Sequence, residues 1–153
     1  MLKSNNKSNH NSNNNNYAKH IFRAYDIRGI AHEELSIELI YKIGRVLGSM
    51  TIESGNSEIA TGRDARLSSP ELSKSLRKGI LDSGCNICDI GIVPTPLLYF
   101  ATHYLDTNSG VMLTGSHNPK HHNGLKTIIN GNSLTEESVK NIYQRIIESN
   151  YLT

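Results

Sequence analysis

The amino-acid sequence predicts an α/β domain of three layers, in which helices cover both faces of a mixed, mostly parallel β-sheet. Strand-like and helix-like segments alternate three times along the chain before a closing strand–strand–helix unit. Three of the helix-like segments begin at recognisable capping residues. The polar excess is confined to the N-terminus, which leaves roughly 135 residues for folding, a common length for one domain.

Residues 1–16 are expected to form a disordered tail. This segment holds eight Asn and three Ser, and Leu2 is its one large apolar side chain beyond Met1. Such a composition buries too little apolar surface to offset the entropy of ordering the chain. The folded domain is therefore expected at 17–153.

The expected elements follow in order. In the first half we expect a strand at 21–25, a turn at 26–29, a helix from Ile37 with Ser36 as its N-cap, a strand at 59–61, and a helix that starts at a Ser68–Glu71 capping box and ends at Gly84. In the second half we expect a strand at 85–90, a helix at 95–104, a strand at 111–113, a loop at 114–123, a strand at 125–129 and a last helix capped by Thr135. Gly44 and Gly48 share one helix face and are expected to let the first helix approach the sheet closely.

Composition excludes several classes of partner. The net charge is +2, and the chain has no Trp and nine Tyr and Phe residues together, which argues against nucleic acid. The most apolar stretch, 92–105, is short and contains Pro94 and Pro96, so no membrane partner is expected. Without a signal peptide, a cytoplasmic location is expected. Cys85 and Cys88 are interpreted as small buried hydrophobic residues rather than a redox pair.

The loops that follow the strands carry the candidate chemistry. In α/β sheets, ligands bind beyond the carboxyl ends of the strands. The loops expected there contain most of the loop arginines together with Ser116, His117 and Lys120, and Lys126 follows at the start of the next strand. A cationic surface around one hydroxyl suits a phosphate group.

The hexapeptide at 114–119, Thr-Gly-Ser-His-Asn-Pro, is the most informative of these loops. Gly115 is expected to adopt a backbone conformation closed to other residues, which presents Ser116 beside His117. The Gly-x-Ser-x-Gly elbow of hydrolases does not fit this segment. From chemistry alone, a turn of small polar residues remains an equal alternative.

This hexapeptide resembles the phosphoserine loop of the α-D-phosphohexomutases, the phosphomannomutase/phosphoglucomutase superfamily. Four further segments are similar to motifs of that family and occur in the same order: Phe22–Gly29, Thr61–Ser68 with its Gly-Arg-Asp-x-Arg pattern, Gly91–Pro96 and Asn123–Lys126. The resemblance covers about residues 21–153, which is only the first of the family's four domains. Lys120, His121 and His122 depart from the family pattern.

The resemblance implies a role for each matching residue. Ser116 would carry the phosphoryl group and, through its phosphate, would be one metal ligand. His117, Lys126 and Arg28 would line the site of phosphoryl transfer. Tyr25 would lie near the sugar, and Arg28 and Lys126 would also bind substrate. Arg63 and Asp64 would shape the shell of residues next to the transfer site.

The implied activity is that of an isomerase, an intramolecular phosphotransferase that interconverts hexose 1-phosphate and hexose 6-phosphate through a bisphosphate. Its substrate would be a hexose phosphate, its activator a hexose 1,6-bisphosphate, and its metal Mg²⁺. The main Mg²⁺ ligands are expected on a missing domain, because no Asp-x-Asp-x-Asp pattern occurs in this sequence. The chain would act with the remaining domains, in the same or a companion chain, and would be inactive without them.

Two other hypotheses stay open at this point. One is a non-catalytic phosphate- or phosphosugar-binding module, or the folded remnant of a split gene. The other is a serine phosphotransferase or hydrolase that works alone, although the sequence lacks a metal site and a full triad for it.

Overall fold

The structure, a computed structural model, describes residues 16–153. The tail expected at 1–16 lies outside the described residues apart from Asn16. The helices are η1 (Lys19–Ile21, a 3₁₀ turn), α1 (Ile37–Glu53), α2 (Ser69–Asp82), α3 (Thr95–Tyr104) and α4 (Glu136–Ile147). The strands are β1 (Ile27–Ile30), β2 (Glu58–Arg63), β3 (Asn86–Ile92), β4 (Gly110–Leu113), β5 (His122–Ile129) and β6 (Asn132–Ser133).

The strands form one mixed sheet in the order β1-β5-β4-β2-β3, with β6 paired to β5. β2 pairs in parallel with both β3 and β4. β5 pairs antiparallel with β1, β4 and β6, so β5 alone runs against the other strands of this sheet. The predicted mixed, mostly parallel sheet is confirmed.

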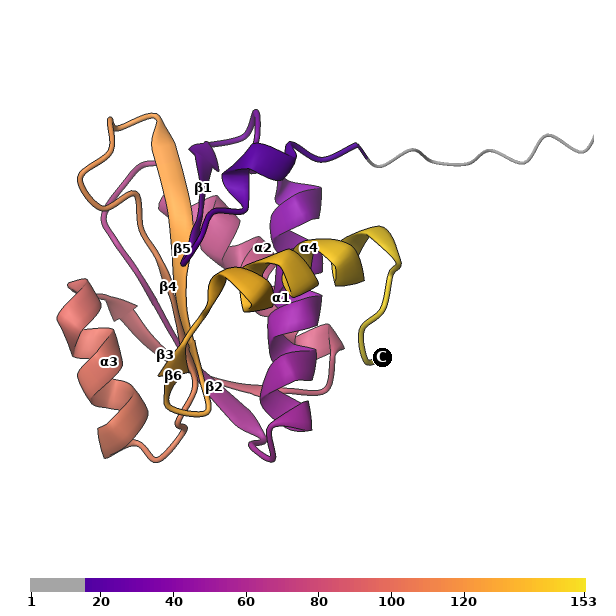
Figure 1. Cartoon of the computed structure of the whole chain (residues 1–153). Helices are drawn as coiled ribbons and strands as arrows, with labels where there is room; N and C mark the ends of the chain where they lie inside the picture. Colours follow the sequence, from indigo (N-terminus) through magenta and orange to yellow (C-terminus); the bar gives the residue numbers. More distant parts are fainter. Residues whose placement is uncertain (1–15) are drawn as a thin grey trace, which may run out of the picture.

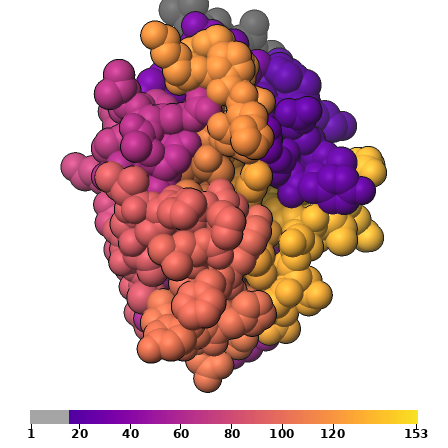
Figure 2. All heavy atoms as spheres, turned by 90° about the vertical axis from the view of Figure 1, so that its left-hand side faces the viewer, coloured from indigo at the N-terminus to yellow at the C-terminus, as the bar shows by residue number. Residues whose placement is uncertain are grey.

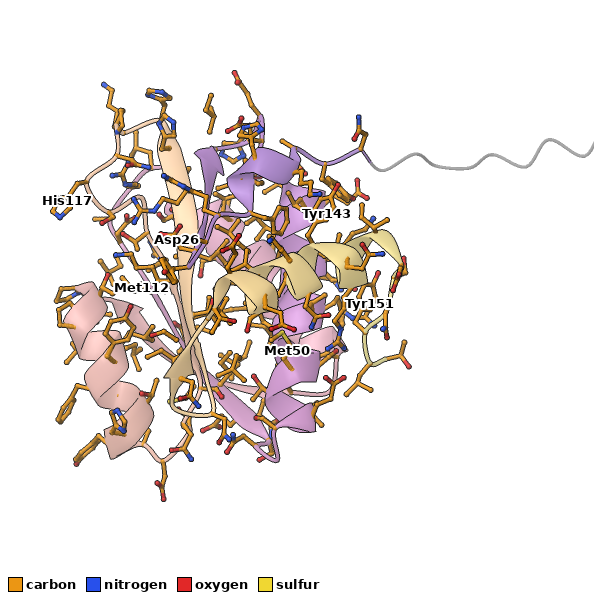
Figure 3. The ribbon with its side chains drawn as sticks, viewed as in Figure 1. Asp26, Met50, Met112, His117, Tyr143 and Tyr151 are labelled. Carbon is orange, nitrogen blue, oxygen red and sulfur yellow. The ribbon has the colours of Figure 1, made fainter. Side chains whose placement is uncertain are left out.

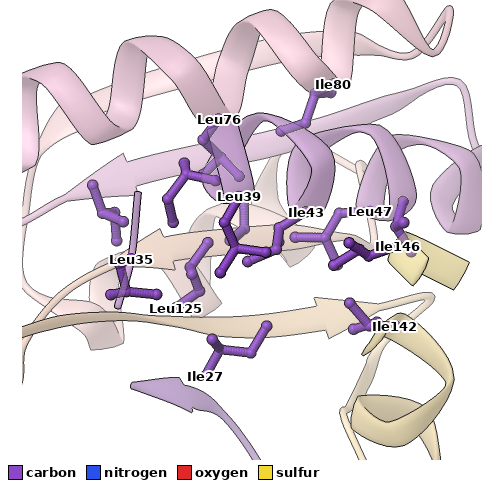
Figure 4. Close-up of a cluster of buried hydrophobic side chains, with 14 of the residues drawn as sticks. Ile27, Leu35, Leu39, Ile43, Leu47, Leu76, Ile80, Leu125, Ile142 and Ile146 are labelled. Carbon is purple, nitrogen blue, oxygen red and sulfur yellow. The ribbon is translucent and has the colours of Figure 1, made fainter. Parts of the chain in front are cut away.

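Helices cover both faces of the sheet, which confirms the three layers (Figure 1). α3 lies on one face, and α1, α2 and α4 lie on the other. The larger core fills the second face, where Leu39, Ile43 and Leu47 of α1 meet Leu125 of β5 (Figure 4). A smaller core of Ala60, Leu98 and Met112 lies under α3. Within residues 16–153 no helix is long and apolar enough to cross a membrane.

Glycines set the close contact between α1 and α2. A Cβ added at Gly44 would overlap the backbone carbonyl of Leu76, and one added at Gly79 would overlap that of Tyr41. Gly48 likewise faces Ser83 and Ile80. The expectation that Gly44 and Gly48 face the sheet is therefore wrong: they face a helix, because α2 packs directly against this stripe of α1.

The N-terminal strand was misplaced by the sequence prediction. The run 21–25 is a 3₁₀ end and an exposed turn, and the strand occupies 27–30, where a turn was expected. The backbone N–H of Arg23 donates to the carbonyl of Asp26 (2.9 Å), which closes that turn. The physical reason is a long-range contact: residues 27–30 form a strand because they pair with β5, about a hundred residues away in the sequence.

Two of the three expected helix caps are confirmed. Ser36 Oγ accepts from the N–H of Leu39 (3.1 Å), and Thr135 Oγ1 accepts from the N–H of Ser138 (3.1 Å). The capping box at Ser68 is wrong, because Ser68 has helical backbone angles and makes no side-chain cap. Its Oγ instead accepts from a distant asparagine, described below.

Candidate functional site

The site is built where one row of paired residues crosses five strands. In order, that row joins Ile92 of β3, Arg63 of β2, Leu113 of β4, Leu125 of β5 and Ile27 of β1. The segments that leave β2, β3 and β4 start from this row, so they emerge at the same edge of the sheet. The loop 114–121, which connects β4 to β5 and carries Ser116, is one of them.

Arg66 holds the serine loop in place from the neighbouring β2–α2 segment. Its guanidinium is largely buried, with 15% of the side chain exposed. It donates to four backbone carbonyl oxygens, those of Ser116 (3.0 Å), Asn118 (2.7 Å), Pro119 (2.6 Å) and His122 (3.0 Å). The planar fork of an arginine can satisfy several acceptors at once, which a lysine cannot. One side chain thereby ties both ends of the loop together.

Asp64 orients this arginine and also holds the loop directly. Its Oδ2 accepts from Arg66 Nε (3.1 Å) and from the N–H of Gly115 (3.0 Å). Its Oδ1 accepts from Ser69 Oγ (2.6 Å) and from the N–H of Arg66 (3.1 Å). Burial raises the pKa of Asp64, but hydrogen bonds from Ser69, Arg66 and Gly115 outweigh it and hold that pKa below its ordinary value. The carboxylate is charged at neutral pH.

Gly115 is required for a different reason from the one predicted. Its φ is not in the left-handed region; the residue that adopts that conformation is Ser116, with φ of 54°. A Cβ at position 115 would overlap the guanidinium of Arg66. The N–H of Ser116 donates to Thr114 Oγ1 (3.0 Å), which supports the unusual turn from within the loop.

Arg28 and Lys126 lie on the face of the sheet that α3 covers. Arg28 pairs with Gly124, and Lys126 follows two residues along β5, opposite Met112 of the smaller core. Arg28 Nη1 donates to Asn118 Oδ1 (3.4 Å), a long contact that reaches the serine loop. Arg28 Nε donates to Asp26 Oδ2 (2.7 Å), which fixes the guanidinium; Asp26 and Met112 are labelled in Figure 3.

His117 and Tyr25 are the most exposed of the predicted site residues. His117 projects from the loop away from the body of the domain (Figure 3). The side chain of Tyr25, which precedes β1, is 75% exposed. Within residues 16–153, no hydrogen bond or ion pair joins the side chain of Tyr25 or Lys126 to the serine loop, and the side chain of His117, a member of that loop, makes none. Arg28, Arg66 and Asp64 are therefore the predicted or motif residues from outside the loop that contact it directly.

An open hollow lies beside Arg28, between β1 and the end of the serine loop. Basic and polar side chains line most of it, among them His20, Arg23, Arg28, Asn118 and His122. Glu34 also lines it and accepts from His20 (2.6 Å). Two arginines therefore border this hollow, and its lining includes Asn118 of the serine loop but not Ser116 itself.

Sequence reasoning assigned no role to Arg66, Ser69 or Asn123. Asn123 is fully buried, and its Nδ2 donates to Ser68 Oγ (2.9 Å) and Ser69 Oγ (3.0 Å), which ties the start of β5 to the start of α2. The available signal was the second arginine of the Gly-Arg-Asp-x-Arg segment. A loop that exposes several carbonyls at a strand end needs a multivalent donor, and Arg66 was the basic side chain of that segment without an assigned role.

The described residues offer little to a metal ion. No group of three or more His, Cys, Asp and Glu side chains within residues 16–153 could hold one. A phosphate on Ser116 would add oxygen ligands, but Mg²⁺ prefers six in an octahedron. The described residues by themselves therefore do not fit a complete Mg²⁺ site.

The fold and the site together define an α/β/α domain that presents a serine on a loop clamped by an arginine–aspartate pair. The family described as "Phosphoglucomutase/phosphomannomutase, alpha/beta/alpha domain I" matches residues 19–152. The chain belongs to this family, and the resemblance found in its motifs is confirmed.

Individual proteins similar to this chain carry names of the same family. The chain is 50% identical over 126 residues to a phosphomannomutase/phosphoglucomutase of Pseudomonas aeruginosa, and the match covers 82% of this chain and 27% of that protein. It is 48% identical over 130 residues to the protein of the same name from Pseudomonas syringae pv. tomato, covering 85% and 28%. A crystal structure of a phosphoglucomutase/phosphomannomutase family protein from Burkholderia thailandensis superimposes with a TM-score of 0.84 at 34% identity, covering 90% of this chain and 32% of that one. The chain thus spans between a quarter and a third of the length of these relatives.

Proposed function

We propose that this chain is the phosphoserine-bearing domain of a phosphohexomutase, with Ser116 as the phosphoryl carrier. The observation that carries the proposal is the clamped loop, in which Arg66 and Asp64 hold Ser116 at the common edge of the sheet. The names of the relatives, phosphomannomutase and phosphoglucomutase, support the reaction class.

Each predicted side chain has a task in this proposal. Arg28, fixed by Asp26 and reaching Asn118, would face the phosphate from one side. Lys126, on the same face of the sheet, would supply a second positive charge. Phosphoryl transfer depends mainly on positioning and on neutralising the charge of the transferred group, so two cations on the face of the sheet beside a held serine loop suit it. Tyr25, largely exposed beside β1, would contact the sugar.

The proposed reaction is two transfers of opposite direction. In the first, the bond between phosphorus and Ser116 Oγ breaks as phosphorus bonds to a hydroxyl oxygen of a hexose monophosphate. That hydroxyl loses its proton to a base, Ser116 Oγ gains one, and a hexose 1,6-bisphosphate results. In the second, the other phosphoryl group of the bisphosphate returns to Ser116. His117 is the proposed proton relay, because its exposed imidazole follows Ser116 in the loop and an imidazole can accept and donate a proton.

Mg²⁺ and the rest of the site are proposed to come from outside residues 16–153. When bound, the ion would neutralise charge on the transferred phosphoryl group. The relatives extend far beyond the matched segment, so their remaining domains are the proposed source of its ligands and of most sugar contacts. These domains could be part of the same chain or of a companion chain.

The test uses a chimera in which residues 19–152 replace the matched segment of the Pseudomonas aeruginosa relative. After incubation with glucose 1,6-bisphosphate, peptide mass spectrometry is expected to find phosphate on the peptide that contains Ser116. A chimera with Ser116→Ala should carry no phosphate and show no conversion of glucose 1-phosphate or mannose 1-phosphate. Phosphate on Ser68 or Ser69 instead would refute the assignment.

Two arginine variants test whether a positive charge beside the serine loop matters more for phosphorylation than one elsewhere on the domain. Arg28→Gln is expected to slow phosphorylation of Ser116 strongly, because it removes the cation that is proposed to face the phosphate and that reaches the serine loop at Asn118. Arg77→Gln, which removes a partly exposed arginine of α2 that pairs with Asp89 of β3, serves as the matched control and should leave the rate unchanged.

A further inference from the structure

The outer face of α3 is unusual for a surface helix. The ten residues of α3, Thr-Pro-Leu-Leu-Tyr-Phe-Ala-Thr-His-Tyr, include no Asp, Glu, Lys or Arg. Its exposed side chains include Leu97, Phe100 and Tyr104, with Phe100 59% and Tyr104 76% exposed. The rings of Phe100 and Tyr104 stack with their centroids 5.5 Å apart. A helix in contact with water normally carries charged residues on this face.

The other covering helices show the expected pattern. The outer face of α2 carries Glu71, Lys74 and Lys78, and that of α4 carries Glu136 and Lys140. α3 packs on β2 and β4, and within the described part of the chain nothing covers its outer side. The apolar surface is therefore a property of this one helix and not of the whole domain.

This apolar face adjoins the serine loop. Ile92, at the end of β3 just before α3, is 59% exposed and extends the patch toward the row where the site loops begin. The negative charge of Asp26, which fixes Arg28, lies close enough to contribute, after burial, to raising the pKa of Tyr99 in α3. Figure 2 shows α3 in salmon at the centre of one face, with the loop after β4 in orange above it.

We infer that the outer face of α3, with Leu97, Phe100, Tyr104 and Ile92, is the surface on which the remaining part of a phosphohexomutase packs. The inference rests on the proposed function. The relatives devote about 72% of their length to residues outside the match, so a large partner exists for such a surface. A site that must exclude water and receive a metal needs that partner on the side of the serine loop, and this face lies on that side.

The composition of the patch fits a buried interface. Exposed contiguous aromatic and aliphatic side chains mark interaction surfaces, and interface cores are depleted in charge and enriched in Tyr and Phe. Tyrosine, here Tyr104, is also among the residues that most often dominate the binding energy of an interface. A second copy of this chain is the competing occupant, and the experiment below distinguishes it.

The experiment measures how fast a cysteine at position 100 reacts with a maleimide. All variants also carry Cys88→Ala, because Cys88 is free and only half-buried and would otherwise react with the maleimide. Cys85 can stay, since burial raises its pKa to about 11 and leaves it a poorly reactive thiol. Phe100→Cys is compared with Leu81→Cys, an exposed position on α2 at the opposite face, whose side chain is 55% exposed.

Each variant is labelled in the 153-residue chain and in the chimera with the Pseudomonas aeruginosa relative, and peptides are quantified by mass spectrometry. Phe100→Cys is expected to react at least about tenfold more slowly in the chimera than in the 153-residue chain, because a side chain in the core of an interface is shielded from the reagent. Leu81→Cys is expected to react at the same rate in both. The same comparison is made with the remainder of the relative added as a separate polypeptide, so that misfolding of the chimera does not decide the result.

Equal reactivity of Phe100→Cys with and without the remainder would overturn the inference. Protection that appears in the 153-residue chain alone and grows with its concentration would assign the face to a second copy and would also overturn it. Labelling needs neither phosphate nor turnover, and repeating it with Ser116→Ala should change nothing. Protection without phosphorylation of Ser116 would leave the docking surface intact and refute the proposed function alone.

Discussion

Replacing Arg66 should release the serine loop while leaving the rest of the domain folded. The side chain donates to four loop carbonyls and to Asp64, and it is largely buried. Hydrogen bonds to a charged donor contribute about 1.5–3 kcal/mol each in mutational series. Water can replace the donor at the more exposed carbonyls, so we expect Arg66→Ala to lower the free energy of unfolding by about 2–4 kcal/mol rather than by the full sum.

The assay combines urea unfolding with hydrogen exchange of the peptide that spans 113–123. Arg66→Ala should speed exchange in that peptide far more than in the core strands. Arg66→Lys should recover little, because an ammonium group has no fork to reach carbonyls at both ends of the loop. Arg77→Ala is the control: this arginine is more exposed, and its ion pair with Asp89 should contribute less than about 1 kcal/mol. If Arg66→Ala unfolded at the same urea concentration as the control, or Arg66→Lys matched the wild type, the clamp would not hold the loop.

Three further results are expected. Gly115→Ala should reproduce the fast loop exchange of Arg66→Ala, because its Cβ displaces the guanidinium of Arg66. The control is Gly131→Ala, at a glycine with open space and φ of 80°, which should leave exchange in the 113–123 peptide unchanged; both variants are first shown by circular dichroism to be folded. Asp64 has a lowered pKa in the folded state, so its stabilisation is present above the unfolded pKa and is lost as the pH falls below about 4; Asp64→Asn should flatten the pH dependence of urea midpoints in that window. The 153-residue chain alone should show no conversion of glucose 1-phosphate or mannose 1-phosphate with bisphosphate and Mg²⁺ in a coupled assay, because orientation alone accounts for about 7–11 kcal/mol of barrier lowering in such sites, and any activity lost on Ser116→Ala would contradict this.

Much of the fold was predictable because its signals are local. Helical periodicity and the side chains of Ser36 and Thr135 place two helices by themselves, and both caps form as expected. The first strand was not predictable in this way. The run 21–25 is as apolar as 27–30, and only pairing with β5 decides which of the two becomes a strand. Ser68 does not act as an N-cap for a similar reason: its Oγ accepts a hydrogen bond from the side chain of Asn123, which is distant in the sequence.

The site shows the same division between local and distant causes. The motif around Ser116 predicted a candidate serine loop, yet the side chains that hold this loop act through contacts that no spacing reveals. Arg66 reaches carbonyls fifty residues ahead in the sequence, and that reach is what forbids a Cβ at Gly115. Sequence reasoning therefore selected the right glycine for the wrong physical reason.

The backbone conformation of Ser116 connects these observations. A left-handed residue other than glycine costs about 1–2 kcal/mol, so it persists only where its surroundings impose it. Here Arg66 fixes the carbonyl of Ser116, and Thr114 Oγ1 fixes its N–H, so the peptide groups on both sides of the serine are held. Asp64 in turn fixes Arg66 and the N–H of Gly115. The segment around Asp64 and the segment around Ser116 thus form one physical unit, in which the strain at the serine is the consequence of a clamp that holds the backbone of its loop at the edge of the sheet where β2 and β4 end.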